Sequence, residues 1–275
     1  MGLSVNTNVT SMNAQNQMAK SQEALKTSFA RLASGMRINS AADDAAGLGV
    51  AKSMNAQVRS YAVAERNTND GISMLQTADG GAEQVHGLLT RMRELAVQAS
   101  NGSMSANDYA NIDKEYQQNL QEIDRVTSSV QFNGINLLSG ATASKSFQVG
   151  IGTATTDRIS VDFGGVDSTS LSVNASKVDS FDDAQAAITS LDAAIQTLSG
   201  KRAQFGASMN RFSAAVTNLQ SMQTNTAAAL SRIQDTDIAS ETANLSKNQV
   251  LSQAGAAILS QANQTPQVAL SLLRG

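Results

Sequence analysis

A seven-residue repeat of apolar side chains between residues 188 and 233 constrains the fold of this chain more than any other feature. Fourteen positions follow one another at alternating spacings of three and four, and eleven of them are large and apolar. They are Ile188, Leu191, Ile195, Leu198, Arg202, Phe205, Met209, Phe212, Val216, Leu219, Gln223, Thr226, Leu230 and Ile233. This spacing is typical of helices that wind around a partner in a left-handed supercoil. At about 1.5 Å per residue it predicts a helix of roughly 70 Å, which needs a partner of matching length.

A second heptad pattern lies between residues 75 and 99. Its members are Leu75, Ala78, Ala82, Val85, Leu89, Met92, Ala96 and Ala99. Gly80 and Gly81 are expected to soften this helix. A third helix follows, with Ser105 or Asn107 as its N-cap. Its apolar face consists of Tyr109, Ile112, Tyr116, Leu120, Ile123 and Val130.

The middle of the chain, at about 141–179, has a different period. Two short runs alternate apolar with polar or glycine residues: Phe147, Val149 and Ile151, then Ile159, Val161 and Phe163. Alternation of this kind predicts a β-hairpin, here with a loop over 152–158. Leu171 and Val173 are expected to add a short strand. Ser180 or Asp182 is the expected N-cap of the helix that follows.

The two terminal segments are predicted as helices with narrow apolar faces. Residues 3–36 carry Val5, Val9, Met12, Leu25, Phe29, Leu32 and Met36. Residues 238–263 carry Ile238, Thr242, Leu245, Val250, Leu251, Ala254, Ile258 and Ala262 as the inward face, and Pro266 is expected to close that helix. Polar connectors at 37–47 and 234–237 border these segments, and Asp43 and Asp44 are interpreted as cap residues.

These elements predict a mainly α fold: an elongated hairpin of long coiled-coil-like helices with a small β-hairpin region inserted in the middle. The helix at 185–233 packs along the helices at 50–130, and the two terminal segments pair with each other. Helices with such thin apolar faces are marginal alone and need a partner.

Composition excludes several classes of function. The net charge is −3 with no run of five like charges, so neither a nucleic-acid partner nor a membrane partner is expected. There is no Cys, and His86 is the only His, so no metal site, cofactor or catalytic constellation is predicted. We expect a protein that is not an enzyme. The first residues lack the pattern of a secretory signal peptide.

Several motifs at both ends of the chain resemble those of bacterial flagellins. The N-terminal motifs are Leu32-Ala-Ser-Gly-Met-Arg-Ile-Asn-Ser-Ala-Ala-Asp-Asp-Ala-Ala-Gly47, Asn69-Asp-Gly-Ile-Ser73, Arg93-Glu-Leu-Ala-Val-Gln98, Glu122-Ile-Asp-Arg125 and Gln131-Phe-Asn-Gly134. The C-terminal motifs are Ser231-Arg-Ile-Gln-Asp-Thr-Asp237, Ala262-Asn-Gln264 and Leu270-Ser-Leu-Leu-Arg274. The resemblance covers roughly 1–140 and 181–275.

The resemblance implies a structural subunit that polymerises head-to-tail into the extracellular bacterial flagellar filament and serves motility. Residues 1–44 and 234–275 would form the inner, terminal-helix domain, and 45–233 the outer helical domain, with large variable outer domains absent. The implied partners are other copies of the chain, the flagellar export apparatus with its export chaperone, and the cap and junction proteins. Export without a cleaved signal peptide is part of the same implication.

We expect the apolar residues of the terminal helices to carry assembly. They are Val5, Val9, Met12, Leu25, Phe29, Leu32, Leu245, Leu251, Ile258, Leu270, Leu272 and Leu273. In a monomer these thin faces cannot offset the entropy lost on ordering, so folding and assembly should be coupled.

The resemblance also implies a surface for a host innate immune Toll-like receptor, at Arg91, Leu95 and Glu122. The alternative interpretation is that this surface exists for packing between subunits and that a receptor exploits it.

Two other functions stay open at this stage: a flagellar hook–filament junction protein, and a coiled-coil adaptor that never polymerises. Deletion of residues 1–36 separates the last of these from a filament subunit, because an adaptor should keep its oligomeric state.

Overall fold

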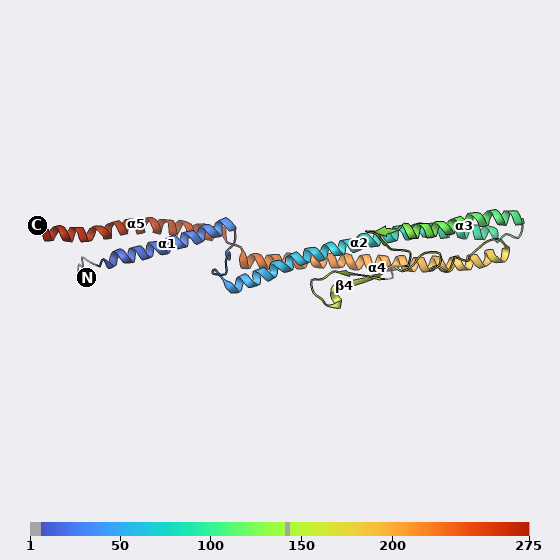
Figure 1. Cartoon of the computed structure of the whole chain (residues 1–275), viewed down its shortest axis with the longest axis horizontal. Coiled ribbons are helices and arrows are strands. Elements are labelled where there is room, and N and C mark those ends of the chain that lie inside the picture. The colour runs from blue at the N-terminus through green and yellow to red at the C-terminus, as the bar shows by residue number, and fades with distance from the viewer. Residues whose placement is uncertain (1–6, 141–143, 275) are drawn as a thin grey trace. The chain divides into compact units, whose positions relative to one another are not determined.

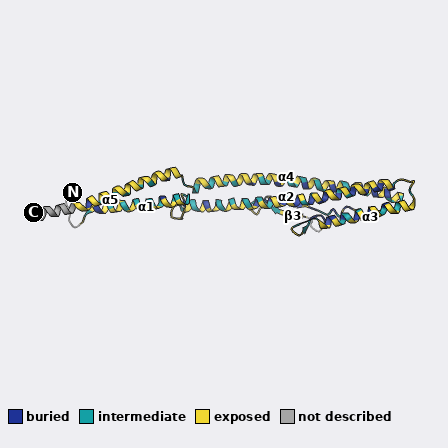
Figure 2. Ribbon diagram, turned by 90° about the horizontal axis from the view of Figure 1, so that it is seen from above, coloured by how far each residue is buried: buried dark blue, intermediate teal, exposed yellow. Residues whose placement is uncertain are grey.

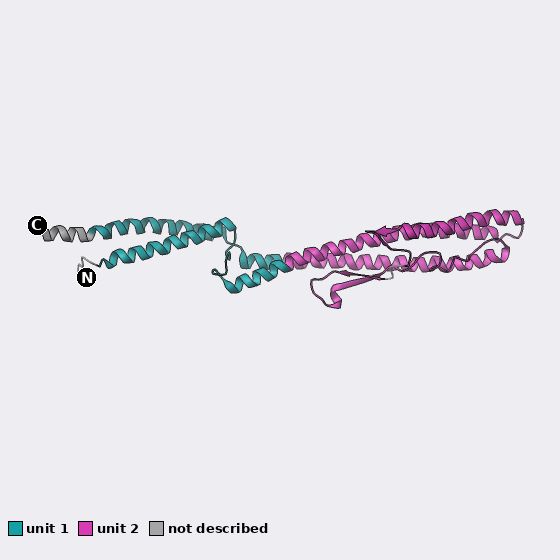
Figure 3. Ribbon diagram, in the orientation of Figure 1, with its two compact units in different colours: residues 1–56, 225–275 teal, residues 57–224 magenta. Residues whose placement is uncertain are grey.

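Long helices make up most of the computed structural model of the chain, which describes residues 7–140 and 144–274, with the backbone alone over 265–274. The described helices, labelled in Figure 1, are α1 (Val9–Ser34), α2 (Ala45–Ala99), α3 (Ala106–Ser129), α4 (Phe181–Gln234) and α5 (Ile238–Arg274). The predicted mainly α fold with a small β insertion is therefore confirmed. The chain forms two compact units, residues 1–56 with 225–275 (unit 1) and residues 57–224 (unit 2), coloured separately in Figure 3.

The core of unit 2 is built by the two heptad patterns. Residues 191, 198, 205, 212 and 219 of α4 are all buried at intervals of seven, and the eight α2 positions predicted from residue 75 to residue 99 are each 0% exposed. Ion pairs between Arg93 and Asp192 and between Asp79 and Arg202 show that α2 and α4 run antiparallel. In Figure 2 the buried residues are dense around α3 and sparse on α1 and α5.

The paired glycines of α2 do not interrupt the helix, which is continuous from Ala45 to Ala99. That they soften it stays a prediction, but packing gives Gly81 a separate role. A Cβ added at Gly81 would lie 2.6 Å from Cγ2 of Val130 and 2.8 Å from Cδ1 of Leu138. Gly81 thus lets the chain that follows α3 approach the α2 backbone closely.

A small hairpin that the sequence interpretation missed follows α3. Strands β1 (Gln131–Phe132) and β2 (Ile135–Asn136) pair antiparallel. Asn133 and Gly134 link them with φ values of 49° and 75°. Two successive residues with positive φ are what a tight hairpin turn requires, and the Asn-Gly dipeptide is its strongest short-range signal.

The predicted β-hairpin of the middle region is confirmed. Strands β3 (Ser144–Gln148) and β4 (Arg158–Asp162) pair antiparallel, with Phe147 opposite Ile159. The loop between them contains a short 3₁₀ helix, η1 (Thr155–Asp157), and leaves Ile151 41% exposed. The Phe147 ring meets the Phe212 ring of α4 edge to face, with centroids 5.4 Å apart, which seats the hairpin on the helix.

The short strand expected at Leu171 and Val173 is absent, and that prediction is wrong. Both side chains are buried, but their backbone forms successive turns in which Ser172 has a positive φ of 59°. Backbone hydrogen bonds from Leu171 to Asp167 and from Val173 to Ser168 satisfy this segment locally, so it needs no strand partner.

The polar connectors are cap structures, as predicted. The Asp44 carboxylate accepts a hydrogen bond from the N–H of Gly47 in the first turn of α2. Asp43 accepts hydrogen bonds from the backbone N–H and the hydroxyl of Ser40, which lower the pKa of its carboxyl. Ser105 caps α3 in a reciprocal box with Asp108. Neither carboxylate of the first connector needs a catalytic role to explain it.

Unit 1 contains the antiparallel pair of helices α1 and α5, which the connectors join at one end, together with the beginning of α2 and the end of α4. The N–H of Arg37 donates to the carbonyl of Gln234, and the N–H of Thr236 donates to the carbonyl of Gly35. The terminal segments therefore pair as predicted. The domain division at 44/45 and 233/234 refers to the assembled protein and stays a prediction.

Candidate assembly surface

The face along which α1 and α5 meet is composed mainly of small and polar residues. In α1 the positions at least partly buried at alternating spacings of three and four are Ser11, Ala14, Met18, Ser21, Leu25, Ser28 and Leu32. In α5 they are Glu241, Leu245, Asn248, Ser252, Gly255, Leu259 and Ala262. We call these fourteen residues the terminal seam. Its heptad spacing brings the helices together, but it offers little apolar area to bury.

Three of the four fully buried positions of the terminal seam are polar: Ser11, Ser28 and Glu241. Ser28 and Glu241 are 3% and 8% exposed, and the Ser28 hydroxyl donates to a Glu241 carboxylate oxygen at 2.5 Å. The guanidinium of Arg31 lies 3.7 Å from the other oxygen of that carboxylate. A buried carboxylate with these two partners is satisfied, but a buried polar pair contributes little net stability.

At the other end of the terminal seam, Asn8 compensates for a proline inside α5. Pro266 lacks an N–H and so leaves the carbonyl of Ala262 without its usual partner within the helix. The side-chain amide of Asn8 donates to that carbonyl at 2.8 Å, while its oxygen caps α1 by accepting from the N–H of Ser11. The prediction that Pro266 closes the last helix is therefore wrong, because α5 continues to Arg274.

Seven large apolar residues of the terminal helices point away from the terminal seam. On α1, Val9, Met12 and Phe29 are 60%, 55% and 59% exposed. On α5 the exposed set is Ile238, Val250, Leu251 and Ile258, with exposed fractions of 47–63%. Of the eight residues expected on the inward face of α5, only Leu245 and Ala262 lie in the terminal seam. The expectation is wrong for the other six, which are exposed: Ile238, Thr242, Val250, Leu251, Ala254 and Ile258. We call the seven large apolar residues the outer apolar set.

The other predicted assembly residues divide into two groups. Leu25, Leu32 and Leu245 are partly buried in the terminal seam. Val5 lies outside the described residues, and the side chains of Leu270, Leu272 and Leu273 are not described. The assignment of all these residues to assembly stays a prediction.

The three predicted receptor residues lie on α2 and α3. Arg91 is exposed and its guanidinium bonds the carboxylates of Glu115 and Glu94. Glu122 is partly exposed and bonds Arg125, which lowers the pKa of its carboxyl. Leu95 is 2% exposed, so its side chain belongs to the core. A receptor surface at these positions stays a prediction.

The described residues contain no group of His, Cys, Asp and Glu side chains that is suited to hold a metal ion. Within the same residues, no helix has both the length and the apolar character needed to span a membrane.

These features define a class of protein made of long helices, with a heptad core buried in one unit and large apolar residues left in solvent on the other. Two family descriptions match the chain: the bacterial flagellin N-terminal helical region over residues 5–143, and the bacterial flagellin C-terminal helical region over residues 188–273. The chain belongs to the bacterial flagellins.

Individual relatives match over nearly the whole chain. The flagellin of Halalkalibacterium halodurans is 39% identical over 272 residues, which cover 98% of this chain and 99% of that protein. The flagellar filament 30.7 kDa core protein of Treponema maltophilum is 36% identical, with the same coverage of both chains. The crystal structure of Bacillus cereus flagellin covers 60% of this chain and 94% of its own, with a TM-score of 0.51 and 34% identity.

Proposed function

We propose that this chain is a structural subunit that polymerises head-to-tail into the bacterial flagellar filament. One observation carries the proposal: the terminal helices pack mainly small or polar residues between themselves and leave the outer apolar set in water. A surface of this kind on a helix pair is typical of a contact with another molecule.

The balance between the free energy of apolar burial and the cost of ordering the helices supports other copies of the chain as the missing partner. Full burial of a Val, Leu, Ile, Phe or Met side chain stabilises by about 1.5–3 kcal/mol. A partner that buries the seven residues of the outer apolar set therefore gains a large favourable free energy. Ordering the backbone of each residue costs about 1–2 kcal/mol, which the thin terminal seam cannot offset alone. Folding of α1 and α5 is therefore coupled to polymerisation.

The family supports the same proposal. The relative from Treponema maltophilum is described by name as a flagellar filament core protein. By similarity, the chain is exported without a cleaved signal peptide through the flagellar export apparatus, with help from an export chaperone. It acts outside the cell, where cap and junction proteins border the polymer. A host Toll-like receptor that contacts α2 and α3 is a further proposed partner.

Deletion of residues 1–36 tests the proposal against the adaptor alternative. A filament subunit loses polymerisation, because α5 then has no partner, while the α-helical signal of unit 2 remains. A matched variant keeps the chain length and changes only the outward face: Val9→Ser, Met12→Ser and Phe29→Ser. It should also stay monomeric. An unchanged oligomeric state in the deletion would support the adaptor.

Electron microscopy of the salted-out wild-type protein separates the filament subunit from the junction protein. We expect long filaments of constant diameter. Rings or short stacks that do not elongate would contradict the filament role and favour the junction protein.

A further inference from the structure

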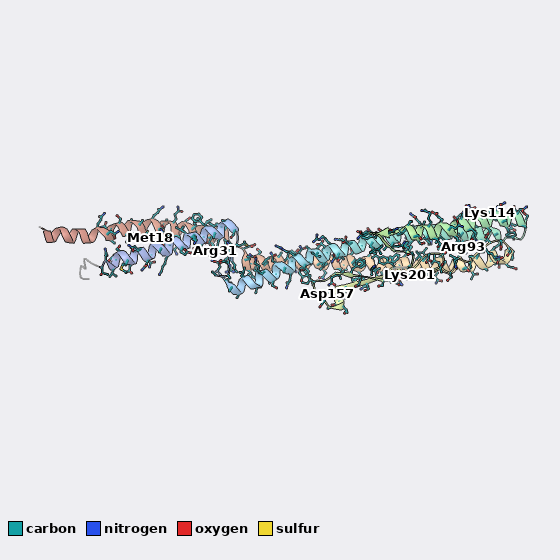
Figure 4. The ribbon with its side chains drawn as sticks, in the orientation of Figure 1. Met18, Arg31, Arg93, Lys114, Asp157 and Lys201 are labelled. Carbon is teal, nitrogen blue, oxygen red and sulfur yellow. The ribbon has the colours of Figure 1, made fainter. Side chains whose placement is uncertain are left out.

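Unit 2 leaves large apolar side chains exposed at its two ends. Among its described residues the exposed ones are Val63, Val97, Ile151, Phe181 and Met222. The antiparallel pairing of α2 and α4, with Glu65 beside Gln220 and Arg93 beside Asp192, places Val97 and Phe181 at one end. The same pairing places Val63 and Met222 toward the other, where the loop carrying Ile151 lies. Figure 4 shows Asp157 of that loop far from Arg93.

The end with Met222 contains a cleft of about 620 Å³. Tyr61, Ile159, Leu219 and Met222 supply apolar surface, and Thr155, Thr156 and Asn218 add polar groups. Arg158 and Arg211 also line it. In the described part of the chain neither arginine has an ion-pair partner, and Arg158 only donates to the amide oxygen of Gln148. Asp157 is the one acid in the lining. An aromatic side chain next to a carboxylate would suit this cleft.

The opposite end presents such a group. Phe181 is the first residue of α4, is 42% exposed, and is followed by the exposed Asp182. Asp179 and Asp183 lie on either side and share Lys177 as their ion-pair partner. The segment 177–183 therefore carries three acids and one base, and Asp182 has no ion-pair partner among the described residues.

We propose that Phe181 and Asp182 of one copy dock into the cleft lined by Arg158 and Arg211 of the next copy. This inference rests on the proposed polymerisation and names the contact that makes it directional. The two surfaces differ and lie at opposite ends of one unit, so the contact is heterologous and generates an open chain of copies instead of a closed dimer. Charge complementarity fixes the partner's orientation, and the aromatic ring supplies the buried anchor.

The docking also fixes the displacement between successive copies along α4. Phe181 and Leu219 lie on the same continuous helix, 38 residues apart by subtraction of their numbers. At about 1.5 Å per residue, parallel copies that dock in this way are displaced along α4 by roughly 57 Å. The filament should therefore show an axial repeat close to this value along each row of docked subunits.

Cross-linking in the polymer tests the contact directly, because the chain has no native Cys. The double variant Phe181→Cys with Asn218→Cys is polymerised and treated with a short bis-maleimide. We expect a ladder of covalent oligomers. The matched control is Gln204→Cys with Asn218→Cys, which uses another exposed position of α4 and should give no ladder.

Two results would overturn the docking proposal. One is a polymer in which the Phe181 pair cross-links no more than the Gln204 pair. The other is a covalent dimer from Phe181→Cys alone, which would indicate a symmetric contact. Failure of the wild-type protein to polymerise at all would instead overturn the proposed function.

Charge reversal gives a second, independent test. Asp182→Lys alone and Arg211→Glu alone should each raise the protein concentration needed for polymerisation severalfold. The double variant Asp182→Lys with Arg211→Glu should recover most of the loss, because each copy carries both reversed surfaces. Phe181→Ala should raise the same threshold about tenfold or more. Two additive charge losses, without recovery, would contradict the pairing.

Discussion

At the scale of single residues, the Ser28–Glu241 pair is where the terminal seam is most sensitive to substitution. Ser28→Ala leaves a buried carboxylate with only the more distant Arg31 as partner. The unmade hydrogen bond should cost about 1–3 kcal/mol and lower the temperature at which the polymer dissolves. Ser28→Ala combined with Glu241→Leu should recover this loss or exceed it, because an apolar pair in place of a buried polar one is often neutral or stabilising.

Thermal dissolution of the polymers, followed by light scattering, measures both variants. Glu241→Gln is the matched control, because it keeps an oxygen that accepts the Ser28 hydroxyl. The contradicting result is a polymer of the double variant that dissolves at a lower temperature than that of Ser28→Ala. It would show that the polar pair stabilises the terminal seam more than an apolar pair does.

Asn8 and Pro266 should be energetically coupled. Asn8→Ala removes both the N-cap of α1 and the donor to the Ala262 carbonyl, and should cost about 1–2 kcal/mol in polymer stability. In a Pro266→Ala background the restored N–H takes over that carbonyl, so the cost of Asn8→Ala should fall to that of the cap alone. A double-mutant cycle on the dissolution temperature measures the coupling. Strictly additive effects would contradict the compensation.

At the scale of elements, we expect alanine substitution at the two adjacent glycines of α2 to change the stability of unit 2 in opposite directions. Gly81→Ala places a Cβ 2.6 Å from Cγ2 of Val130, which should destabilise unit 2 by about 1–3 kcal/mol through overpacking. Gly80→Ala meets no atom within 4 Å and should stabilise the helix by about 0.5–1 kcal/mol. Thermal unfolding of the monomer followed by circular dichroism checks the pair. Equal effects of the two substitutions would show that helix propensity, and not packing, decides.

The hydrogen-bonded cap of α3 should make the stability of the monomer depend on pH. The hydroxyl and N–H of Ser105 donate to the Asp108 carboxylate and lower the pKa of that carboxyl in the folded state. The unfolded state then binds the proton more tightly, so the stabilisation is present above about pH 4 and is lost as the pH falls through the folded-state pKa. Acid unfolding of the monomer should show a smaller loss below pH 4 in Asp108→Asn than in the wild-type chain. Identical acid profiles would exclude this cap as a contributor.

The sequence predicts the elements of unit 2 well, because their stripes of large apolar residues are regular and bury against each other. Its prediction fails at Pro266, where the side-chain amide of Asn8 donates to the carbonyl that the proline leaves without a helical partner. It also misplaces the α5 face: Val250, Leu251 and Ile258 suggest an inward stripe, whereas Gly255 and Ser252 allow closer helix contact. The inward face of a helix that belongs to an assembly cannot be read from apolar character alone, because two different partners compete for the same residues.

At the scale of the whole molecule, the candidate assembly surface follows only partly from sequence. The list of terminal apolar residues contains the outer residues Val9, Met12 and Phe29 together with the seam residues Leu25 and Leu32. Periodicity places all of them on helices, but their division into two faces appears only when α1 and α5 are paired. The docking of Phe181 likewise does not follow from sequence alone. It depends on the antiparallel pairing of α2 and α4, which places Phe181 and the cleft at opposite ends of unit 2.

The coupling of terminal folding to polymerisation is the central claim, and trypsin digestion tests it most directly. Purified protein is digested once as a salt-free monomer and once after salting-out into polymer. We predict that the monomer is cut at Lys20, Arg31, Arg37 and Lys247, leaving a resistant fragment of about 50–233, and that the polymer protects all four sites. Terminal helices that resist trypsin in the monomer as well as unit 2 does would contradict the claim and favour a chain that folds without its neighbours.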